Sequence, residues 1–266
     1  MGMDLGIGGK TALITGSTAG IGYAIAQGLA AQGVAVTLTG RTAERVEAAK
    51  ARLAAAVPGA KVDGVAADCG TAEGAAAVVA KRAAVDILVN NLGIYERKPF
   101  FDTPDEDWLR LFEVNVLSGV RFARHYAPAM VAKGWGRILF VSSESGLNIP
   151  KEMIHYGMSK TAQLSISRGL AIELAGTGVT VNALLPGPTR TENSERMRAE
   201  RAKAAGVTVA ELEADFFKSF RPTSLTRKFH DADEVASLAV YACSALASAT
   251  SGACLRADGG TVNQIM

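Results

Sequence analysis

The stretch Lys10-Thr-Ala-Leu-Ile-Thr-Gly-Ser-Thr-Ala-Gly-Ile-Gly22 decides how the rest of the chain can fold. Its first six residues form an apolar run typical of a buried strand, and three glycines follow within the next seven residues. Apolar residues then recur at helical spacing from Tyr23 to Ala30, and Gly33 ends the pattern. A second strand is predicted over 34–39. The stretch therefore predicts a strand, a glycine-rich turn, a helix and a strand, in which the helix N-terminus can receive a pyrophosphate.

The same alternation continues along the chain. Further strands are predicted over 61–67, 86–90, 137–142 and 179–185 and between Gly252 and Gly260, and helices near 72–83, 105–133, 156–175 and 231–246. Strands that alternate with helices pair in parallel through right-handed crossovers. The sequence therefore predicts an α/β fold with a doubly wound, Rossmann-like parallel sheet, as a single domain over 1–266. Ligands of such sheets bind at the carboxyl ends of the strands.

A second informative stretch runs from Val141 to Lys160. Tyr156 and Lys160 stand four residues apart and so lie on one face of the predicted helix. A lysine cation one turn away favours the phenolate and brings the tyrosine hydroxyl toward a useful pKa range. Ser143, at the end of the preceding strand, could reach the same small volume. Because Tyr–Lys pairs also occur on many helices as solvated pairs, the catalytic interpretation depends on the rest of the chain.

Taken together, the motifs resemble the classical short-chain dehydrogenase/reductase family over nearly the whole chain, from Lys10 to about Val262. The matching pieces are Thr15-Gly-Ser-Thr-Ala-Gly-Ile-Gly22, Asn90-Asn-Leu-Gly93, Asn115, Ser143, Tyr156-x-x-x-Lys160 and Pro186-Gly187. The chain departs from the family at Leu92, where alanine is usual, so packing near the cofactor must differ. Ser142 is a second candidate serine, but the spacing to Tyr156 favours Ser143.

The resemblance implies a role for each matching residue. Tyr156 would be the general acid or base, Ser143 would polarise the substrate oxygen, and Lys160 would bind the nicotinamide ribose and tune the tyrosine. Asn115 would hold a water that links the lysine to solvent as a proton relay. The cofactor-binding residues implied are Gly16, Ser17, Thr18, Gly20, Ile21, Gly22, Arg41, Asp68, Cys69, Asn91, Gly93, Tyr156, Lys160, Pro186, Gly187 and Thr189.

The end of the second predicted strand bears on the choice of nicotinamide cofactor. NAD-specific sites place a carboxylate there, whereas this chain reads Thr39-Gly-Arg-Thr42. Arg41 would meet a 2′-phosphate with planar donors, so NADP(H) is expected to be preferred, with NAD(H) possible. The alternative is that Arg41 is a solvated residue at a helix start. Many NADP-preferring members carry a basic residue where this chain has Ala19, so the preference is expected to be modest.

Four functions fit these motifs to different degrees. The favoured one is an NADPH-dependent carbonyl reductase, or the corresponding alcohol dehydrogenase, acting on a small molecule. A 3-oxoacyl-carrier-protein reductase shares all the motifs, and an NAD-dependent hydroxysteroid or polyol dehydrogenase is disfavoured by Gly40-Arg41. A non-catalytic regulator built on the same fold would be expected to lack Tyr156 or Lys160, and both are present.

Composition argues against several other classes of protein. The 266 residues carry a formal net charge of +2, which gives no electrostatic footprint for nucleic acid or an anionic membrane. No apolar run is long enough to span a membrane, and the beginning of the chain has no apolar signal core. The three cysteines are far apart, and the three histidines lack metal-ligand spacing, so no metal is expected. These features fit a cytoplasmic protein.

Two further features suggest a lid and self-association. The segment 188–229 is longer than a simple connection requires and contains helical patterns near 194–205 and after Thr208. We expect it to form a lid over the substrate with Phe216, Phe217 or Phe220 in an apolar pocket; the alternative is that these residues only anchor the segment. The helix after Tyr156 is apolar on more than one side, which favours a homotetramer.

Overall fold

The computed structural model describes residues 4–265, so positions 1–3 and 266 of the predicted domain lie outside it. Its centre is a seven-stranded, fully parallel sheet with the strand order β3-β2-β1-β4-β5-β6-β9. The strands are β1 (Thr11–Ile14), β2 (Ala35–Gly40), β3 (Val62–Ala66), β4 (Ile87–Asn90), β5 (Gly136–Val141), β6 (Val179–Pro186) and β9 (Cys254–Ala257). The order reverses between β1 and β4, which confirms the predicted doubly wound α/β sheet.

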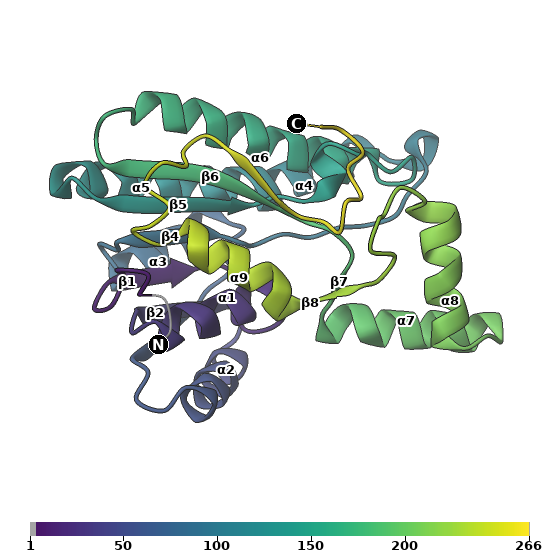
Figure 1. Cartoon of the computed structure of the whole chain (residues 1–266), viewed down its shortest axis with the longest axis horizontal. Coiled ribbons are helices and arrows are strands. Elements are labelled where there is room, and N and C mark those ends of the chain that lie inside the picture. Colours follow the sequence, from purple (N-terminus) through teal and green to yellow (C-terminus); the bar gives the residue numbers. More distant parts are fainter. Residues whose placement is uncertain (1–3, 266) are drawn as a thin grey trace.

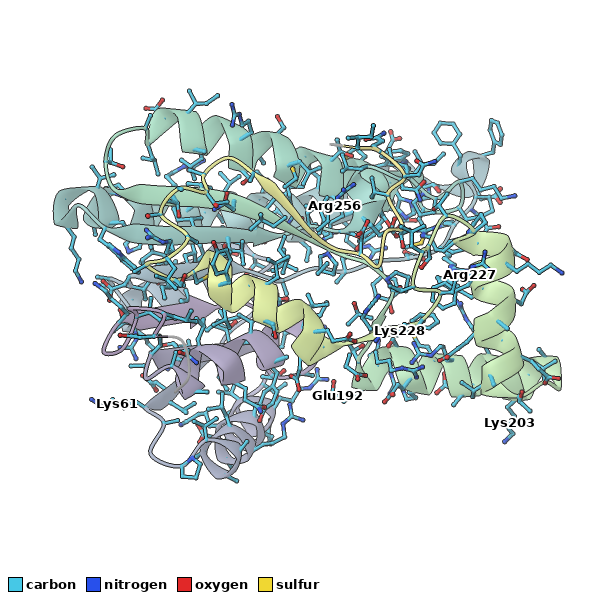
Figure 2. The ribbon with its side chains drawn as sticks, in the orientation of Figure 1. Lys61, Glu192, Lys203, Arg227, Lys228 and Arg256 are labelled. Atoms are coloured by element: carbon cyan, nitrogen blue, oxygen red, sulfur yellow. The ribbon has the colours of Figure 1, made fainter. Side chains whose placement is uncertain are left out.

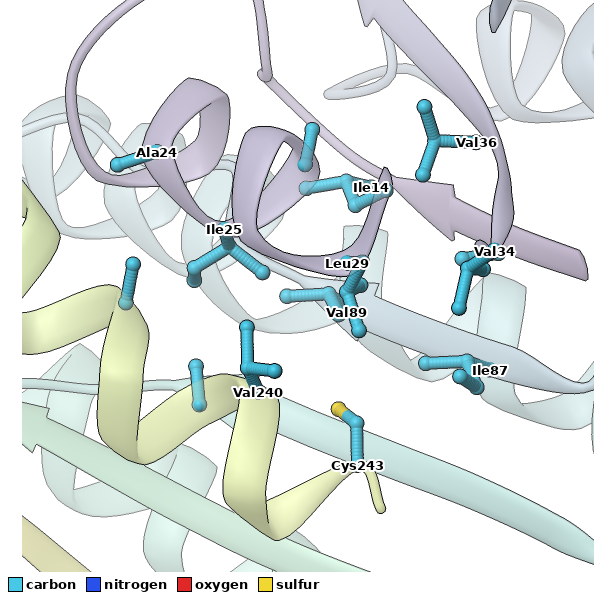
Figure 3. Close-up of a cluster of buried hydrophobic side chains, with 14 of the residues drawn as sticks. Ile14, Ala24, Ile25, Leu29, Val34, Val36, Ile87, Val89, Val240 and Cys243 are labelled. Carbon is cyan, nitrogen blue, oxygen red and sulfur yellow. The ribbon is translucent and has the colours of Figure 1, made fainter. Parts of the chain in front are cut away.

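Helices cover both faces of this sheet (Figure 1). They are α1 (Gly20–Ala31), α2 (Ala43–Ala56), α3 (Ala72–Lys81), α4 (Asp105–Phe112), α5 (Ser118–Lys133), α6 (Ile154–Glu173) and α9 (Ala232–Ala242). One core cluster joins α1 and α9 to the sheet through Ile25, Leu29 and Val240 (Figure 3). On the other face, the aromatic side chains of α5 pack against Phe140 of β5. Neighbouring residues of one strand, such as Leu13 and Ile14, pack into the cores on opposite faces of the sheet because side chains alternate along a strand.

The helix predicted over 105–133 is interrupted where Asn115 lies. A π-helical turn, η2 (Glu113–Leu117), separates α4 from α5, and the Ser118 N–H bonds to the Glu113 carbonyl five residues back. Turns of this kind occur frequently at functional sites. Two other predicted bounds also change: α6 begins at Ile154 and so includes the turn before Tyr156, and α9 ends at Ala242.

The segment predicted as a lid forms structure of its own. It contains β7 (Thr189–Arg190), α7 (Glu192–Ala205), α8 (Val209–Asp215) and a π-helical turn, η4 (Phe216–Phe220), before β8 (His230–Asp231). Thr208 and Glu211 form the capping box that their spacing predicts. Figure 1 shows α7 and α8 together at one end of the molecule, beyond the carboxyl ends of the central strands.

Candidate active site

The glycine-rich turn joins β1 to α1 and is held by Asn91. The Asn91 side chain donates to the carbonyls of Thr15 and Gly16 at 2.9 and 3.0 Å. Gly16 has a φ of +61°, which other residues rarely adopt, and a Cβ on Gly22 would collide with the Asn91 amide. These glycines keep the backbone thin at the start of α1, so a pyrophosphate can approach the helix N-terminus. The turn therefore has the shape that a dinucleotide requires.

The other predicted residues of this turn have different surroundings. The Ser17 hydroxyl is fully buried, donates to the Ile14 carbonyl at 2.7 Å and accepts from the Thr39 N–H at 3.0 Å. Its side chain is therefore occupied in closing the turn. Thr18 packs against Gly40 at the end of β2, where a Cβ would collide with its methyl group. This contact brings the exposed Arg41 next to the turn.

Asp68 and Cys69 follow β3 and differ in exposure. Asp68 is exposed, and its carboxylate accepts from the Gly70 N–H at 3.0 Å. Cys69 is only 3% exposed, and its thiol donates to the Thr39 hydroxyl at 3.4 Å. Burial raises the pKa of this thiol to about 11. The Cys69 side chain thus faces the core, which leaves its backbone as the part that can meet a ligand.

Leu92 explains how the chain accommodates its departure from the usual alanine. Its side chain is partly buried and packs against the second core cluster. A Cβ on Gly16 would lie 3.3 Å from Leu92 Cδ1, so the leucine contacts the glycine-rich turn directly. The Thr15 hydroxyl accepts from the N–H groups of Asn91 and Leu92, both at 3.0 Å. The larger side chain of Leu92 is therefore accommodated by packing between the core and the glycine-rich turn.

Lys160 lies in a buried pocket with Gly93 and Asn115. The lysine is 4% exposed, and its Nζ donates to the Val141 carbonyl at 2.9 Å and to Gln163 Oε1 at 3.1 Å. A Cβ on Gly93 would come within 3.3 Å of this Nζ and 3.6 Å of Asn115 Oδ1. The structure thus brings together three of the predicted residues, from the loop after β4, from η2 and from α6.

The Tyr156 ring lies close to this lysine, with its centroid 5.7 Å from Lys160 Nζ. Interaction with the Ser143 side chain lowers the pKa of the tyrosine hydroxyl, although not enough to offset burial. The Ser142 hydroxyl instead donates to the Lys160 backbone carbonyl at 2.8 Å and is 4% exposed. Of the two serines, the structure therefore favours Ser143 as the one that can reach a substrate. The Tyr156 ring packs edge-on against Tyr95, with ring centroids 6.2 Å apart.

The charges of this pair differ from the sequence-based expectation. Burial raises the pKa of Tyr156 to about 12 and lowers the pKa of Lys160 to about 7. The lysine Nζ lies 5.7 Å from the centroid of the tyrosine ring, and its hydrogen bonds go to Val141 and Gln163. Among the protein's own groups, desolvation therefore outweighs the attraction that was expected to lower the tyrosine pKa.

The Asn115 side chain fixes the loop that follows β4. Its Oδ1 accepts from the Ile94 N–H at 2.8 Å, and its Nδ2 donates to the Ile94 carbonyl and to Ser159 Oγ, both at 2.9 Å. Its backbone carbonyl accepts from Gln163 Nε2 at 2.6 Å. Asn115, which was expected to hold a relay water, is thus hydrogen-bonded through its backbone carbonyl to the Gln163 side chain of α6.

Sequence reasoning missed three residues at the glycine-rich turn. The Gly20 N–H donates to Glu192 at 3.0 Å, and Arg52 bonds both to Glu192 at 3.3 Å and to the Thr18 carbonyl at 3.2 Å. Thr191 lies over Gly20, where a Cβ would approach its methyl group to 3.1 Å. Figure 2 shows Glu192 at the end of α7 that faces the body of the molecule. Because Gly20 and Glu192 are 172 residues apart, no local pattern signals the contact.

The predicted residues after β6 adjoin β9. Pro186 ends β6, and the Gly187 N–H donates to the Ala257 carbonyl at 3.0 Å. A Cβ on Gly187 would collide with the backbone of Asp258, so only glycine fits there. The Thr189 hydroxyl donates to the Gly187 carbonyl at 2.9 Å. This hairpin-like corner carries the chain from the sheet edge into α7.

Comparison with known proteins identifies the family. The model of the family described as short chain dehydrogenase matches residues 10–202. This chain belongs to the short-chain dehydrogenase/reductase family. It is 46% identical over 263 residues to an uncharacterized oxidoreductase of Bacillus subtilis, YvaG, covering 99% of this chain and 100% of the relative. It is also 35% identical over 262 residues to D-beta-hydroxybutyrate dehydrogenase of Cupriavidus necator, covering 97% and 100%.

The fold of this short-chain dehydrogenase/reductase also matches solved structures. L-sorbose reductase of Gluconobacter frateurii, complexed with NADPH and L-sorbose, superimposes with a TM-score of 0.92 at 31% identity, covering 99% of this chain and 100% of that one. The protein is therefore an oxidoreductase that acts on alcohol or carbonyl substrates. Among residues 4–265, no helix has both the length and the hydrophobicity of a membrane span, and no group of His, Cys, Asp or Glu could hold a metal ion.

The segment 188–229, which we predict to be a lid, contacts the loops after β4 and β5 through aromatic and charged side chains. Phe216 and Phe217 lie 5.1 Å apart between ring centroids and contact Phe229 at 4.9 and 5.2 Å. Phe220 is flanked by the guanidinium groups of Arg97 and Arg221, 4.1 and 4.4 Å from its centroid. The rings of Phe216 and Phe217 thus pack within this segment, and Phe220 lies 5.3 Å from Phe216 and beside Arg221, which bonds Glu144, the residue after Ser143.

Proposed function

We propose that this protein is an NADP(H)-dependent carbonyl reductase, or the corresponding alcohol dehydrogenase, for a small polar substrate. The proposal rests above all on one observation: Nζ of the buried Lys160 lies 5.7 Å from the centroid of the Tyr156 ring, at the carboxyl end of β5, where Ser143 begins the next turn. A hydroxyl that can donate a proton and a second donor beside it are what a carbonyl oxygen requires as it gains negative charge. The relative that binds NADPH and L-sorbose supports both the cofactor and the substrate class.

The residues available to hold the cofactor fit a dinucleotide. The turn Gly16–Gly22 would receive the pyrophosphate, and the corner with Pro186, Gly187 and Thr189 would border the nicotinamide. Arg41 would pair with a 2′-phosphate through its planar donors, since it is exposed beside Thr18. Asn91 and Gly93 would shape the floor, with Asp68 and the Cys69 backbone at the adenine end.

Within this proposal, the protein's own side chains donate and accept the proton of the reaction. Hydride chemistry belongs to the nicotinamide when it is bound. Ser143 donates a hydrogen bond to the substrate oxygen, and Tyr156 gives that oxygen its proton during reduction or removes one during oxidation. Lys160, whose pKa is lowered to about 7 by burial, is partly cationic at neutral pH and supplies positive charge near the phenol. A positive charge bound next to the Tyr156 hydroxyl would stabilise the phenolate and so lower the pKa of Tyr156 from about 12.

A second candidate substrate class is a small oxo- or hydroxy-acid. Arg97 is exposed beside Phe220, and its pKa is lowered first by desolvation and then by repulsion from the nearby cations Arg201 and Arg221. Arg97 has no ion pair within 4.0 Å among the residues that the structure describes. A carboxylate on the substrate would relieve the repulsion between these cations. The hydroxybutyrate dehydrogenase relative supports this alternative, and Arg97→Ala would then raise KM for acids only.

We further propose that the protein is a cytoplasmic homotetramer. Leu109 and Phe112 on α4 and Ile172 on α6 are exposed by 67%, 38% and 63%. Large apolar side chains exposed on a helix are a feature of association surfaces. Light scattering at micromolar concentration should give four times the mass of one chain; a monomer would refute this part of the proposal.

A substrate screen tests the proposed function. Purified protein is mixed with NADPH or NADH and a panel of ketoses, simple ketones, oxo-acids and 3-oxoacyl thioesters, and loss of the reduced nicotinamide is followed by absorbance. We expect turnover with NADPH and at least one small polar ketone. Turnover confined to 3-oxoacyl thioesters would favour the carrier-protein reductase, and turnover confined to NADH would favour the NAD-dependent alternatives.

A further inference from the structure

A buried glutamine joins the two groups that the family resemblance connects through water. Gln163 lies one turn beyond Lys160 on α6 and is 1% exposed. Its Oε1 accepts from Lys160 Nζ at 3.1 Å, and its Nε2 donates to the Asn115 backbone carbonyl at 2.6 Å. An ammonium can only donate and a carbonyl can only accept, so these partners fix which end of the amide faces which group.

The burial of this amide calls for a specific reason. A polar side chain taken out of water costs free energy unless its donors and acceptors are bonded. The next residue, Leu164, packs with Ala183 and Leu185 as an ordinary core residue of this helix. Gln163 instead forms hydrogen bonds with Lys160 and with Asn115 of η2. Its polar groups are thus directed at the candidate catalytic lysine rather than at the general packing of α6.

We propose that Gln163 is a positioning residue that clamps the Lys160 ammonium to η2 and stands in place of the expected relay water between Lys160 and Asn115. The inference rests on the proposed function, because it assigns Lys160 a part in that chemistry. An amide keeps its two N–H hydrogens at neutral pH and does not titrate, so it passes no proton to the Asn115 carbonyl. Lys160 then exchanges protons on the side of Tyr156 and the substrate.

The same contact should also affect the charge of the lysine, whose pKa is lowered by burial. A hydrogen bond to an ammonium favours its charged form, which opposes the effect of burial. The other titratable or charged groups that face this part of the site are Tyr156 on the same helix, Glu144 after β5, Tyr95 after β4 and Arg221 from the lid. None of them forms a hydrogen bond with Lys160 Nζ, whose partners among residues 4–265 are Val141 and Gln163. A change at Gln163 should therefore act on Lys160 directly.

Two substitutions with opposite effects test the proposal. Gln163→Leu removes the acceptor, so the pH at which NADPH affinity and kcat/KM fall on the alkaline side should decrease by about one unit. Gln163→Glu places a carboxylate beside the lysine, and the same pH should increase by about one unit or more. Ser167→Ala is the matched control, because Ser167 is buried one turn further along α6 and its hydroxyl has no partner. It should leave the alkaline limb unchanged.

NADPH affinity, measured by fluorescence titration across pH, separates this inference from the proposed function. If the wild type binds NADPH without turning over any carbonyl, the proposed function fails, while opposite shifts of the binding limb still support the role of Gln163. If both variants keep the wild-type limb, the role is overturned, even if both have a lower melting temperature. If Gln163→Leu does not fold, the Gln163→Glu shift alone decides.

Discussion

Glu144 and Arg221 form an ion pair in which both side chains are almost fully buried, at 5% and 6% exposure. Arg221 Nε and Nη2 donate to the same carboxylate oxygen at 2.9 and 2.7 Å, and Nη2 also bonds Ser145 at 3.2 Å. Glu144 directly follows Ser143, and Arg221 directly follows η4 at the end of the lid. The pair therefore ties the lid to the loop that carries the candidate catalytic serine.

Breaking this pair on one side should be costly. Arg221→Met leaves a buried carboxylate without its partner, and we expect the free energy of unfolding to fall by about 3–5 kcal/mol. The double variant Glu144→Met/Arg221→Met removes both charges and should recover much of that loss. Denaturant unfolding of the wild type, both single variants and the double variant gives the coupling energy. Strictly additive losses would contradict the assignment of the pair as a unit.

The aromatic side chains of the lid should separate into two functional groups. Phe217 is 6% exposed and packs against Phe216 and Phe229, so Phe217→Ala should lower stability by about 3–5 kcal/mol with little effect on KM. Phe220 lies between Arg97 and Arg221, so Phe220→Ala should raise KM for bulky ketones while NADPH affinity stays nearly constant. Thermal unfolding and steady-state kinetics on both variants check this. Unchanged KM in Phe220→Ala would mean that the ring only anchors the lid.

Cofactor selectivity should depend on Arg41. Removing its guanidinium is expected to weaken NADPH binding by about 1.5–3 kcal/mol, the range for a hydrogen bond to a charged group, with a smaller effect on NADH. Calorimetric titration of Arg41→Ala with both cofactors measures this. Lys61→Ala is the control for charge, because Lys61 lies just before β3, away from the carboxyl ends of the strands (Figure 2). Equal weakening of both cofactors by Arg41→Ala would refute the role.

Lys160 should make stability depend on pH. Its pKa in the folded protein is about 7, against 10.5 for an ordinary lysine. Between these values the unfolded chain binds more protons, so the free energy of unfolding should rise as pH increases from about 7 to about 10.5, by up to the order of 3–5 kcal/mol, and this contribution should be absent below pH 7, where both states bind the proton. Lys160→Met should lose this part of the rise. Parallel pH profiles for the two proteins in denaturant unfolding would argue against a neutralised buried lysine.

The sequence allowed prediction of the features that are written in local patterns. The seven parallel strands follow from apolar runs that alternate with helical spacing, and the spacing from Tyr156 to Lys160 is enough to put both on one face of α6. The right-handed crossovers expected between parallel strands fit helices on both faces of the sheet, whereas the order of the strands comes from the structure. The glycines of the first turn could also be predicted from the sequence, because a turn of this kind requires residues without side chains.

Features that depend on tertiary packing could not be predicted in this way. The interruption of the long helix at Asn115 depends on bonds from its neighbours Ile94 and Gln163, and nothing in the local sequence marks it. Glu192 reads as an ordinary residue at a helix start, although it bonds the Gly20 N–H across 172 residues. The pKa of Lys160 depends on how completely the fold buries it, which spacing along a helix does not reveal.

The proposed function depends most on Tyr156, which we propose transfers the proton in an NADPH-dependent carbonyl reduction. The most direct measurement is the rate of NADPH oxidation with a ketone that the wild type reduces, compared with that of Tyr156→Phe. Tyr95→Phe is the control, since its ring contacts Tyr156 from the neighbouring loop. We predict that Tyr156→Phe keeps NADPH affinity and loses about 10²–10⁴-fold in turnover, whereas Tyr95→Phe retains most of it. Near-wild-type turnover in Tyr156→Phe would contradict the account.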